Sequence, residues 1–235
     1  MNWNNYECDG QMSVFDLEMP KKKMKVLVAC EESQRVCIEF RKLGHEAYSC
    51  DIQECSGGHP EWHINEDVLN ILNGNCSFIT SDNLKHYIDG KWDLIIAHPP
   101  CTYLSNAGAR FLYPKGVLND DRLKLGLEAK KFFMKFYNAN CERIVIENPI
   151  PSKVFKLPPY TQTIQPYEFG HPFQKKTCLW IKGLQPLQPT DIIPKENRQS
   201  TKIAGNWFNK GGKERQKNRA KTFPGIAKAM AEQWG

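Results

Sequence analysis

The sequence predicts an α/β protein, in a single domain, built on a doubly wound and mostly parallel β-sheet. Three apolar runs carry this prediction: residues 25–30, 94–97 and 142–147. Each run is short and is bounded by a turn signal, as is typical of strands buried on both faces of a parallel sheet. The first run leads into a helical pattern and a second strand, which is the opening unit of a Rossmann-like sheet.

A helix follows the strand 25–30. It is predicted to run from Ser33, whose hydroxyl can cap the N-terminus, to Leu43, because apolar residues recur on one face and Gly44 comes next. The second strand, residues 45–50, completes the strand–helix–strand unit.

Asp51 ends the second strand, where an acidic side chain can bind both ribose hydroxyls of an adenosine cofactor. The glycine-rich turn that holds a pyrophosphate is absent, and Glu31 and Glu32 stand in its place and would repel phosphate. S-adenosylmethionine carries a sulfonium and an ammonium group and no phosphate, so it fits better than NAD or ATP. The residues predicted to bind this methyl donor, S-adenosylmethionine, are Ala29, Cys30, Glu31, Asp51, Ile52, Asp67, Val68 and Pro99.

Two neighbouring features leave alternatives open. Cys50, Cys55, His59 and His63 offer two sulfurs and two imidazoles, a ligand set suited to tetrahedral zinc. Their spacing matches no common zinc motif, so a plain loop without metal is favoured. Asp67 either accepts a hydrogen bond from the adenine amine or is the acid at a helix N-terminus.

The run 94–97 ends at Pro99 and Pro100, because proline cannot donate to a strand ladder. Cys101 follows directly, outside the carboxyl end of the strand, where open α/β sheets bind ligands. Its thiol is a candidate nucleophile, and a buried inert cysteine is the alternative. The loop 102–116, rich in small and aromatic residues, is predicted to be mobile and to lie over the site.

A long helix is predicted to begin at Asp120 or Asp121. Its core-facing residues are predicted from their helical spacing to be Leu125, Ala129, Phe132, Phe133 and Phe136.

Glu147 ends the strand 142–147, so it should meet Cys101 at the same edge of the sheet. An apolar crevice would keep Glu147 protonated at neutral pH. A thiolate can add to C6 of a cytosine if a proton is supplied at N3, and a protonated Glu can supply it. The addition makes C5 nucleophilic toward a methyl donor, so the two side chains form a chemical pair.

Positive charge is concentrated in residues 195–221. This stretch has nine Lys or Arg and two Glu, a net charge of +7, whereas the whole chain carries +6. A local basic stretch with aromatic residues suits DNA, because phosphate contacts and stacking give affinity without sequence readout. A solvated basic loop is the alternative. The predicted DNA-contacting residues are Lys202, Trp207, Lys210, Lys213, Arg215, Lys217 and Arg219.

Residues 1–23 are polar and form an extension. Residues 11–17 within it resemble the peptide by which many bacterial and phage replication proteins dock on the sliding clamp. In that peptide Gln11, Ser13 and Phe15 would be the clamp-binding residues, with apolar anchors in a groove and the glutamine holding register. An arm packed on the domain is the alternative.

The composition fits a protein with a core of its own, because 40% of the 235 residues are hydrophobic. No stretch is long and apolar enough to cross a membrane, and no signal-peptide pattern is present, so a soluble intracellular protein is expected. The nine cysteines follow no regular spacing, which indicates reduced thiols.

The motifs at both reactive residues resemble a known family. Pro99-Pro100-Cys101 and Glu147-Asn148-Pro149 are similar to the Pro-Cys and Glu-Asn-Val motifs of cytosine-5 DNA methyltransferases. Residues 174–178 resemble that family's Gln-x-Arg-x-Arg strand, and residues 224–234 its closing helix. The resemblance covers roughly residues 25–181 and this helix. A compact phage and prophage branch is similar at His98–Cys101, Gly170–Pro172, Thr177–Gly183 and Pro224–Ala227.

This resemblance implies a class I methyltransferase-like fold with S-adenosylmethionine as cofactor. It implies that Cys101 is the nucleophile, that Glu147 is the N3 proton donor, and that Asp51 binds the donor ribose. Lys176 would replace the arginine that steadies the base, whereas Cys178 stands at the second arginine. It also implies a phage or prophage protein in the cytoplasm of a bacterial host.

Few residues separate Ile181 from the last helix, too few for a usual target-recognition domain, so low sequence specificity is expected. Two alternatives stay open: a degenerate methyltransferase fold that binds DNA or a replisome partner, and a pyrimidine-modifying enzyme with another donor or a nucleotide substrate. The predicted division is an extension at 1–23, a catalytic core at 24–183, a basic segment at 184–222 and a C-terminal helix at 223–235.

Overall fold

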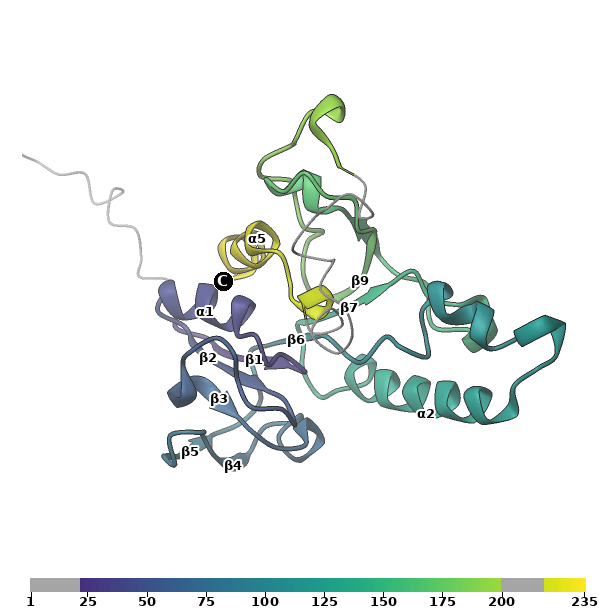
Figure 1. The fold of residues 1–235 in the computed structure, drawn as a ribbon. Helices are drawn as coiled ribbons and strands as arrows, with labels where there is room; N and C mark the ends of the chain where they lie inside the picture. Colours follow the sequence, from purple (N-terminus) through teal and green to yellow (C-terminus); the bar gives the residue numbers. More distant parts are fainter. Residues whose placement is uncertain (1–21, 200–217) are drawn as a thin grey trace, which may run out of the picture.

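The computed structural model describes residues 22–199 and 218–235. Its centre is a seven-stranded sheet of order β3-β2-β1-β6-β7-β9-β8 (Figure 1). Neighbouring strands from β3 to β7 pair in parallel, whereas β9 is antiparallel to both β7 and β8. The prediction of an α/β protein with a mostly parallel sheet is therefore confirmed. The strands are β1 Lys25–Ala29, β2 Glu46–Cys50, β3 His63–Ile64, β6 Leu94–Ala97, β7 Ile144–Pro149, β8 Gln162–Ile164 and β9 Thr177–Lys182.

The strand order explains where a ligand would bind. The chain runs outward from β1 to β2 and β3, and then returns to place β6 on the other side of β1. This reversal is the topological switch point of a doubly wound sheet, and in such sheets ligands bind outside the carboxyl ends of the strands that flank it, here β1 and β6. The antiparallel β9, inserted between β7 and β8, departs from the plain dinucleotide-binding order.

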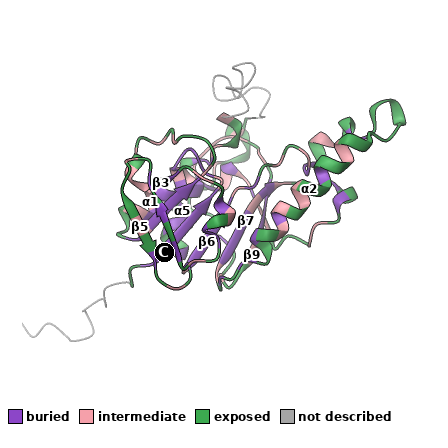
Figure 2. Cartoon of the chain, turned by 90° about the horizontal axis from the view of Figure 1, so that it is seen from below, coloured by how far each residue is buried: buried purple, intermediate pink, exposed green. Residues whose placement is uncertain are grey.

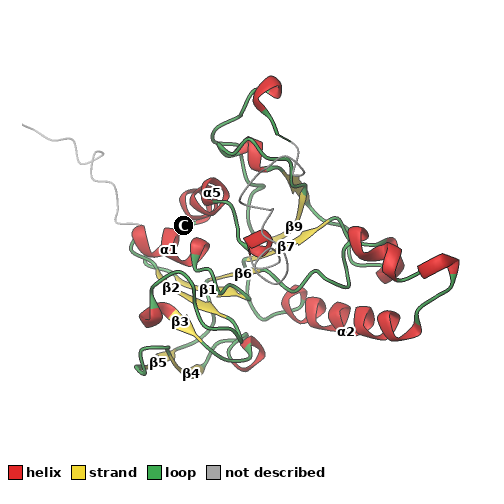
Figure 3. Ribbon diagram, in the orientation of Figure 1, coloured by secondary structure: helices red, strands yellow, loops and turns green. Residues whose placement is uncertain are grey.

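Helices cover both faces of the sheet (Figure 3). The helices α1 and α5 pack together on one face, and α2 and the hairpin β4–β5 lie on the other. Successive strand residues alternate between the two resulting cores, as a period of two requires. The sheet is consequently buried, and the outer sides of the helices are exposed (Figure 2). The bounds are α1 Arg35–Lys42, α2 Asp120–Tyr137, α5 Pro224–Trp234, β4 Cys76–Ile79 and β5 Lys85–Ile88.

Short 3₁₀ helices occupy many of the connections. They are η2 Pro60–Trp62, η3 Val68–Asn70, η4 Asn106–Phe111, η5 Pro114–Gly116, η6 Lys153–Phe155, η7 Pro166–Glu168 and η8 Lys195–Asn197. Together with the start of α2, the segment that holds η4 and η5 extends away from the sheet instead of covering it (Figure 1). Within residues 22–199 and 218–235, no helix combines the length and the apolar character needed to cross a bilayer.

The N-terminus of α1 is capped by a residue other than the predicted one. Gln34 occupies the cap position with φ 57° and makes no side-chain cap bond, so the prediction that Ser33 caps this helix is wrong. Glu31 does so instead, since its two carboxylate oxygens accept from the backbone N–H groups of Val36 at 2.7 Å and Cys37 at 3.2 Å. A carboxylate is favoured at this position by the helix dipole as well.

The buried side of α2 also differs in one residue from the prediction. Phe133 and Phe136 are fully buried, as expected, but Leu125 is 47% exposed. The buried side passes through Gly126, where a Cβ atom would lie 2.2 Å from the ring of Phe155. The helix therefore packs closely against η6, and Leu125 is turned to solvent.

Two of the predicted segments fall outside the described residues. The clamp-like peptide 11–17 is one, and residues 200–217 of the basic segment are the other. The affected DNA-contact predictions are Lys202, Trp207, Lys210, Lys213, Arg215 and Lys217.

Candidate active site

Two adjacent parallel strands bring Cys101 and Glu147 to one edge of the sheet. Ala97 of β6 lies opposite Ile146 of β7. Glu147 is therefore the next residue beyond this pair, and Cys101 follows a few residues beyond Ala97. Burial raises the pKa of the Cys101 thiol, and the charge of Glu147 raises it further. Glu147 thus exerts an electrostatic effect on the candidate nucleophile.

The turn that carries Cys101 is held by its neighbours. Asn148, which is fully buried, donates a hydrogen bond from Nδ2 to the carbonyl oxygen of Pro99 at 3.3 Å. The carbonyl oxygen of Cys101 accepts from the N–H groups of Leu104 at 3.2 Å and Ser105 at 3.0 Å. The ends of β6 and β7 are thereby linked, and the backbone of Cys101 is fixed beside them.

His98 lies between the two strand ends and contacts Glu147. Its backbone N–H donates to the carbonyl oxygen of Ala29 at 2.9 Å, which ties the end of β6 to β1. Its Nδ1 lies 3.1 Å from Oε2 of Glu147, and the two side chains are only 8% and 14% exposed. Nothing in the sequence reasoning identified this residue as part of the site.

The His98 contact decides the charge of Glu147. Burial alone would raise the pKa of Glu147, but the hydrogen bond with His98 and the charge of Lys175 outweigh it, and the pKa lies below its ordinary value. Burial alone would lower the pKa of His98, but Glu147 outweighs it, and the pKa is raised. Both shifts favour an imidazolium–carboxylate pair in the resting site over the protonated Glu147 that the sequence predicts.

Positive charge reaches the site from Lys175. This residue precedes β9, and its Nζ donates to the carbonyl oxygen of Arg219 at 2.9 Å. The charges of Lys175 and Arg219 both favour the thiolate of Cys101, although burial and Glu147 dominate its pKa. Arg219 is the one predicted DNA-contact residue within the described chain, and it lies at the candidate site.

Lys176 is exposed, and its charge acts on the other face of the sheet. Side chains alternate between the two faces of a sheet along a strand. Leu179 shares the α1/α5 face with Val145, and Thr177, two residues earlier, lies on that face as well, so the residue directly before Thr177 is directed to the opposite face. Lys176 instead affects Cys178. Burial raises the pKa of Cys178 to about 11, and the charge of Lys176 acts in the opposite direction. The structure thus brings Lys175, and not Lys176, to Glu147.

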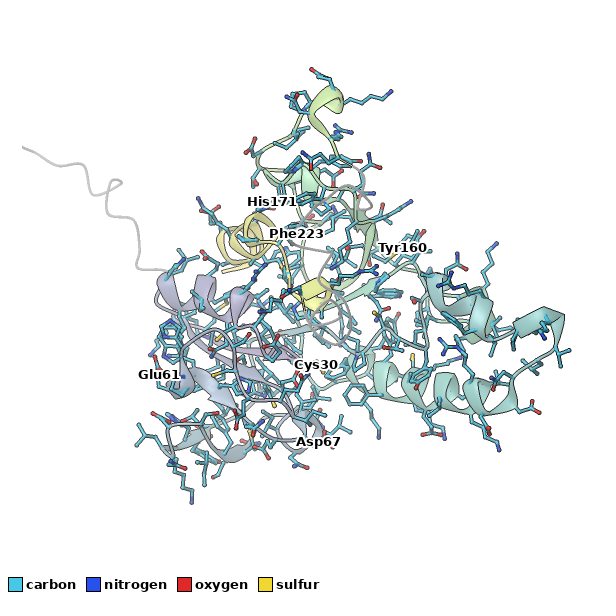
Figure 4. The ribbon with its side chains drawn as sticks, in the orientation of Figure 1. Cys30, Glu61, Asp67, Tyr160, His171 and Phe223 are labelled. Carbon is cyan, nitrogen blue, oxygen red and sulfur yellow. The ribbon has the colours of Figure 1, made fainter. Side chains whose placement is uncertain are left out.

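The predicted donor-binding residues surround the ends of β1 and β2. Burial raises the pKa of Cys30, and the charge of Asp51 raises it further, with a smaller effect from Asp67 (Figure 4). Asp51 Oδ1 accepts from the N–H of Gln53 at 2.9 Å, and Asp67 Oδ1 accepts from that of Leu69 at 3.0 Å. This acidic rim fits a cationic ligand such as a sulfonium and disfavours a diphosphate.

The remaining predicted donor-binding residues differ in their accessibility. Ala29, Val68 and Pro99 are buried, and Ile52 is 78% exposed beside Asp51, where it could cover an adenine ring. Glu31 is 4% exposed and caps α1, so its carboxylate is directed at the helix and away from this rim. Asp67 is the cap of η3, as the simpler of the two interpretations predicts.

Three of the four candidate zinc ligands, Cys50, His59 and His63, have other partners. His63 Nδ1 lies 2.9 Å from Ser49 Oγ, and its Nε2 lies 2.9 Å from the carbonyl oxygen of Gln53. His59 stacks on Trp62 with ring centroids 3.9 Å apart. Among the residues that the structure describes, no three His, Cys, Asp or Glu side chains converge on a metal position.

A cavity of about 910 Å³ lies away from these groups, along the second half of α2. It contains none of the predicted site residues, and lysine and leucine side chains form much of its wall. Comparison with protein-family models and with curated proteins gives no match for this chain. Function is therefore inferred from the chemistry of the residues around Cys101.

Proposed function

We propose that this protein is an S-adenosylmethionine-dependent enzyme with a class I methyltransferase-like fold, which methylates C5 of cytosine in DNA. One observation carries the proposal. Cys101 and Glu147 follow adjacent parallel strands, lie at one sheet edge, and interact electrostatically. A sulfur nucleophile beside a group that can hand over a proton is what addition to a pyrimidine ring requires.

The residues have complementary roles in the proposed reaction. As Cys101 Sγ bonds to C6 of the cytosine, the thiol proton leaves to water, Glu147 takes up a proton and places it on N3, and the ring electrons shift so that C5 becomes nucleophilic. S-adenosylmethionine would supply the methyl group that C5 takes. Loss of the C5 proton to water, departure of the Cys101 thiolate and return of the N3 proton to Glu147 then restore the neutral ring. Because burial raises the pKa of Cys101, the protonated thiol is favoured before substrate enters.

The acidic rim supports the choice of donor. Cys30, Asp51 and Asp67 lie at the carboxyl ends of β1 and β2 and before η3, next to the switch point. Negative charge there attracts a sulfonium and an ammonium group and repels phosphates. A donor bound at this position would lie beside the end of β6, which leads into the Cys101 turn.

The positive charge near the nucleophile supports a nucleic-acid substrate. Lys175 and Arg219 act on Cys101 from the opposite side of the site, and the segment 195–221 carries a net charge of +7. Contacts of this kind are made to phosphates and carry no base sequence, so low sequence specificity is proposed. A duplex target would need its cytosine flipped out, at a cost of a few kcal/mol.

Methyl transfer by two substituted proteins tests the proposal. Cys101→Ser should abolish formation of 5-methylcytosine in DNA, and Glu147→Gln should slow it by about 10²-fold or more. Cys55→Ser replaces a loop cysteine outside the proposed machinery and is the matched control. Digested DNA is analysed by mass spectrometry after incubation with labelled donor.

Unchanged methylation by Cys101→Ser would defeat the mechanism. Label found in free pyrimidine nucleotides and not in DNA would replace the substrate with a nucleotide. Calorimetric titration with S-adenosylmethionine gives a separate answer on the donor: heat of binding that is lost in Asp51→Ala supports the acidic rim, and no heat from the unsubstituted protein would favour a binding protein without catalysis.

A further inference from the structure

Three buried ionisable side chains lie in a row across the sheet. Glu31 and His98 follow β1 and β6, and Glu147 lies in β7; the three strands are neighbours in the sheet. Glu31 is bonded to the N-terminus of α1, which identifies the face. His98 and Glu147 are two residues beyond Ile96 and Val145, both of which pack against α1 and α5. The row therefore lies on the face of the sheet that α1 and α5 cover, and it crosses the switch point between β1 and β6.

His98 is the middle of this row. Its Nδ1 contacts Glu147 at 3.1 Å, and its Nε2 is buried and has no hydrogen-bond partner among the described residues. The charged groups that act on it are Glu147 from β7, Glu31 from the β1–α1 turn, and Lys175 from the segment before β9. Two carboxylates against one lysine favour an imidazolium, and its Nδ1 proton, which faces Glu147, can be passed to that carboxylate.

A Cys–His–Glu hydrolase triad does not describe this arrangement. In such a triad the second imidazole nitrogen bonds to the nucleophile. Here Nε2 of His98 makes no hydrogen bond with Cys101, and neither residue is among the main electrostatic influences on the other. The charge of Glu147 instead raises the pKa of both the Cys101 thiol and the His98 imidazole.

We propose that His98 is a positioning residue that stores the proton which Glu147 delivers to N3 of the pyrimidine, an inference that rests on the proposed function. Before addition, His98 is an imidazolium and Glu147 a carboxylate. As Sγ bonds to C6, the proton on Nδ1 passes to Oε2 while Glu147 protonates N3, and the thiol proton leaves to water. On elimination the N3 proton returns through Glu147 to His98 and the departing thiolate takes a proton from water, so the site ends as it began.

The addition step can be isolated with DNA that contains 5-fluorocytosine. After methylation C5 has no proton to lose, so elimination stops and a covalent adduct with Cys101 accumulates. Its rate of formation is measured from about pH 5 to pH 9, which spans the ordinary pKa values of Glu and His. His98→Gln keeps a polar contact to Glu147 but stores no proton. His86→Gln, in the hairpin β4–β5, is the matched control.

The unsubstituted protein should react at a constant rate through neutral pH and lose rate once His98 gives up its proton. In His98→Gln the rate of adduct formation should fall once the pH exceeds the ordinary pKa of Glu. At neutral pH this rate should be about 10²-fold lower than in the unsubstituted protein. Its affinity for DNA should not change. An unaltered rate and pH profile in His98→Gln, beside an active parent, would overturn the inference and leave the proposed function intact.

A second measurement needs neither activity nor a variant. In the unsubstituted protein, ¹⁵N NMR should show both nitrogens of His98 protonated at pH 7. A neutral imidazole there would overturn the inference, whatever the enzyme does. Absence of any adduct with the unsubstituted protein, with His98 charged, would count against the proposed function instead.

Discussion

Replacement of Gly225 by alanine should weaken the packing of α5 against the rest of the protein and lower the stability of the fold. A Cβ atom at this position would lie 1.9 Å from the carbonyl oxygen of Phe169. The N–H of Gly225 also donates to Nε2 of His171 at 3.0 Å, so this end of α5 cannot move without breaking that bond (Figure 4). Residues 170–172 and residues 224–227, which are distant in sequence, therefore meet at one contact.

The cost can be worked out from these contacts. Overpacking costs about 1–3 kcal/mol, and rigid backbone places this site at the upper end. Loss of the hydrogen bond to His171 adds about 1 kcal/mol. A total of about 4 kcal/mol corresponds to a fall in Tm of about 8–16 °C for a chain of this size.

Thermal unfolding followed by circular dichroism measures the effect. Lys228→Ala is the control, because its ion pair with Glu232, at 3.7 Å, is exposed on the same helix and contributes a few tenths of a kcal/mol at most. If Gly225→Ala melts with the parent protein, the close approach of α5 to Phe169 does not exist, and the placement of the C-terminal helix is refuted.

Two further substitutions test the site and its support. Lys175→Met should slow methyl transfer about tenfold or more, as loss of a charged contact worth about 1.5–3 kcal/mol predicts, and Lys176→Met should slow it less. Burial lowers the pKa of His171, so its contribution to stability is present above about pH 6.5, the ordinary histidine value, and is lost as pH falls through the lower folded value. The Tm of the parent should thus fall more between pH 7.5 and pH 5.5, about one unit on either side of that value, than the Tm of His171→Gln. Equal falls would contradict this.

Local patterns predicted four strands of the sheet and the helices α1 and α2, whereas β3, β8 and the hairpin β4–β5 were not predicted. Apolar runs and their proline or glycine boundaries located β1, β2, β6 and β7 within one or two residues. β7 runs on to Pro149 because β9 pairs with it there, and that partner is distant in sequence. Leu125 was misplaced for the same kind of reason, since the contact between Gly126 and Phe155 joins α2 to a segment beyond the next strand.

The sequence predicted the site residues at the ends of the strands, but it did not predict the residues that surround them. Cys101 and Glu147 could be paired because the carboxyl ends of parallel strands share an edge. His98 carries a signal that was overlooked, since it falls on the same alternate positions as Leu94 and Ile96. Lys175 could not be chosen over Lys176 without knowing which face β9 turns toward β7, and only the sheet decides that.

One backbone angle explains why Glu31 belongs to the row that contains His98. Val28 packs against α1 and α5, and simple alternation would place Cys30 on the same face. Cys30 has φ 58°, in the left-handed region, and its side chain packs with the core on the α2 side instead. The turn thereby directs Glu31 back to α1, where it caps the helix and contributes negative charge to His98. A left-handed non-glycine residue costs about 1–2 kcal/mol. Here that strain places the Cys30 thiol on the α2 face of the sheet and the Glu31 carboxylate on the α1 face.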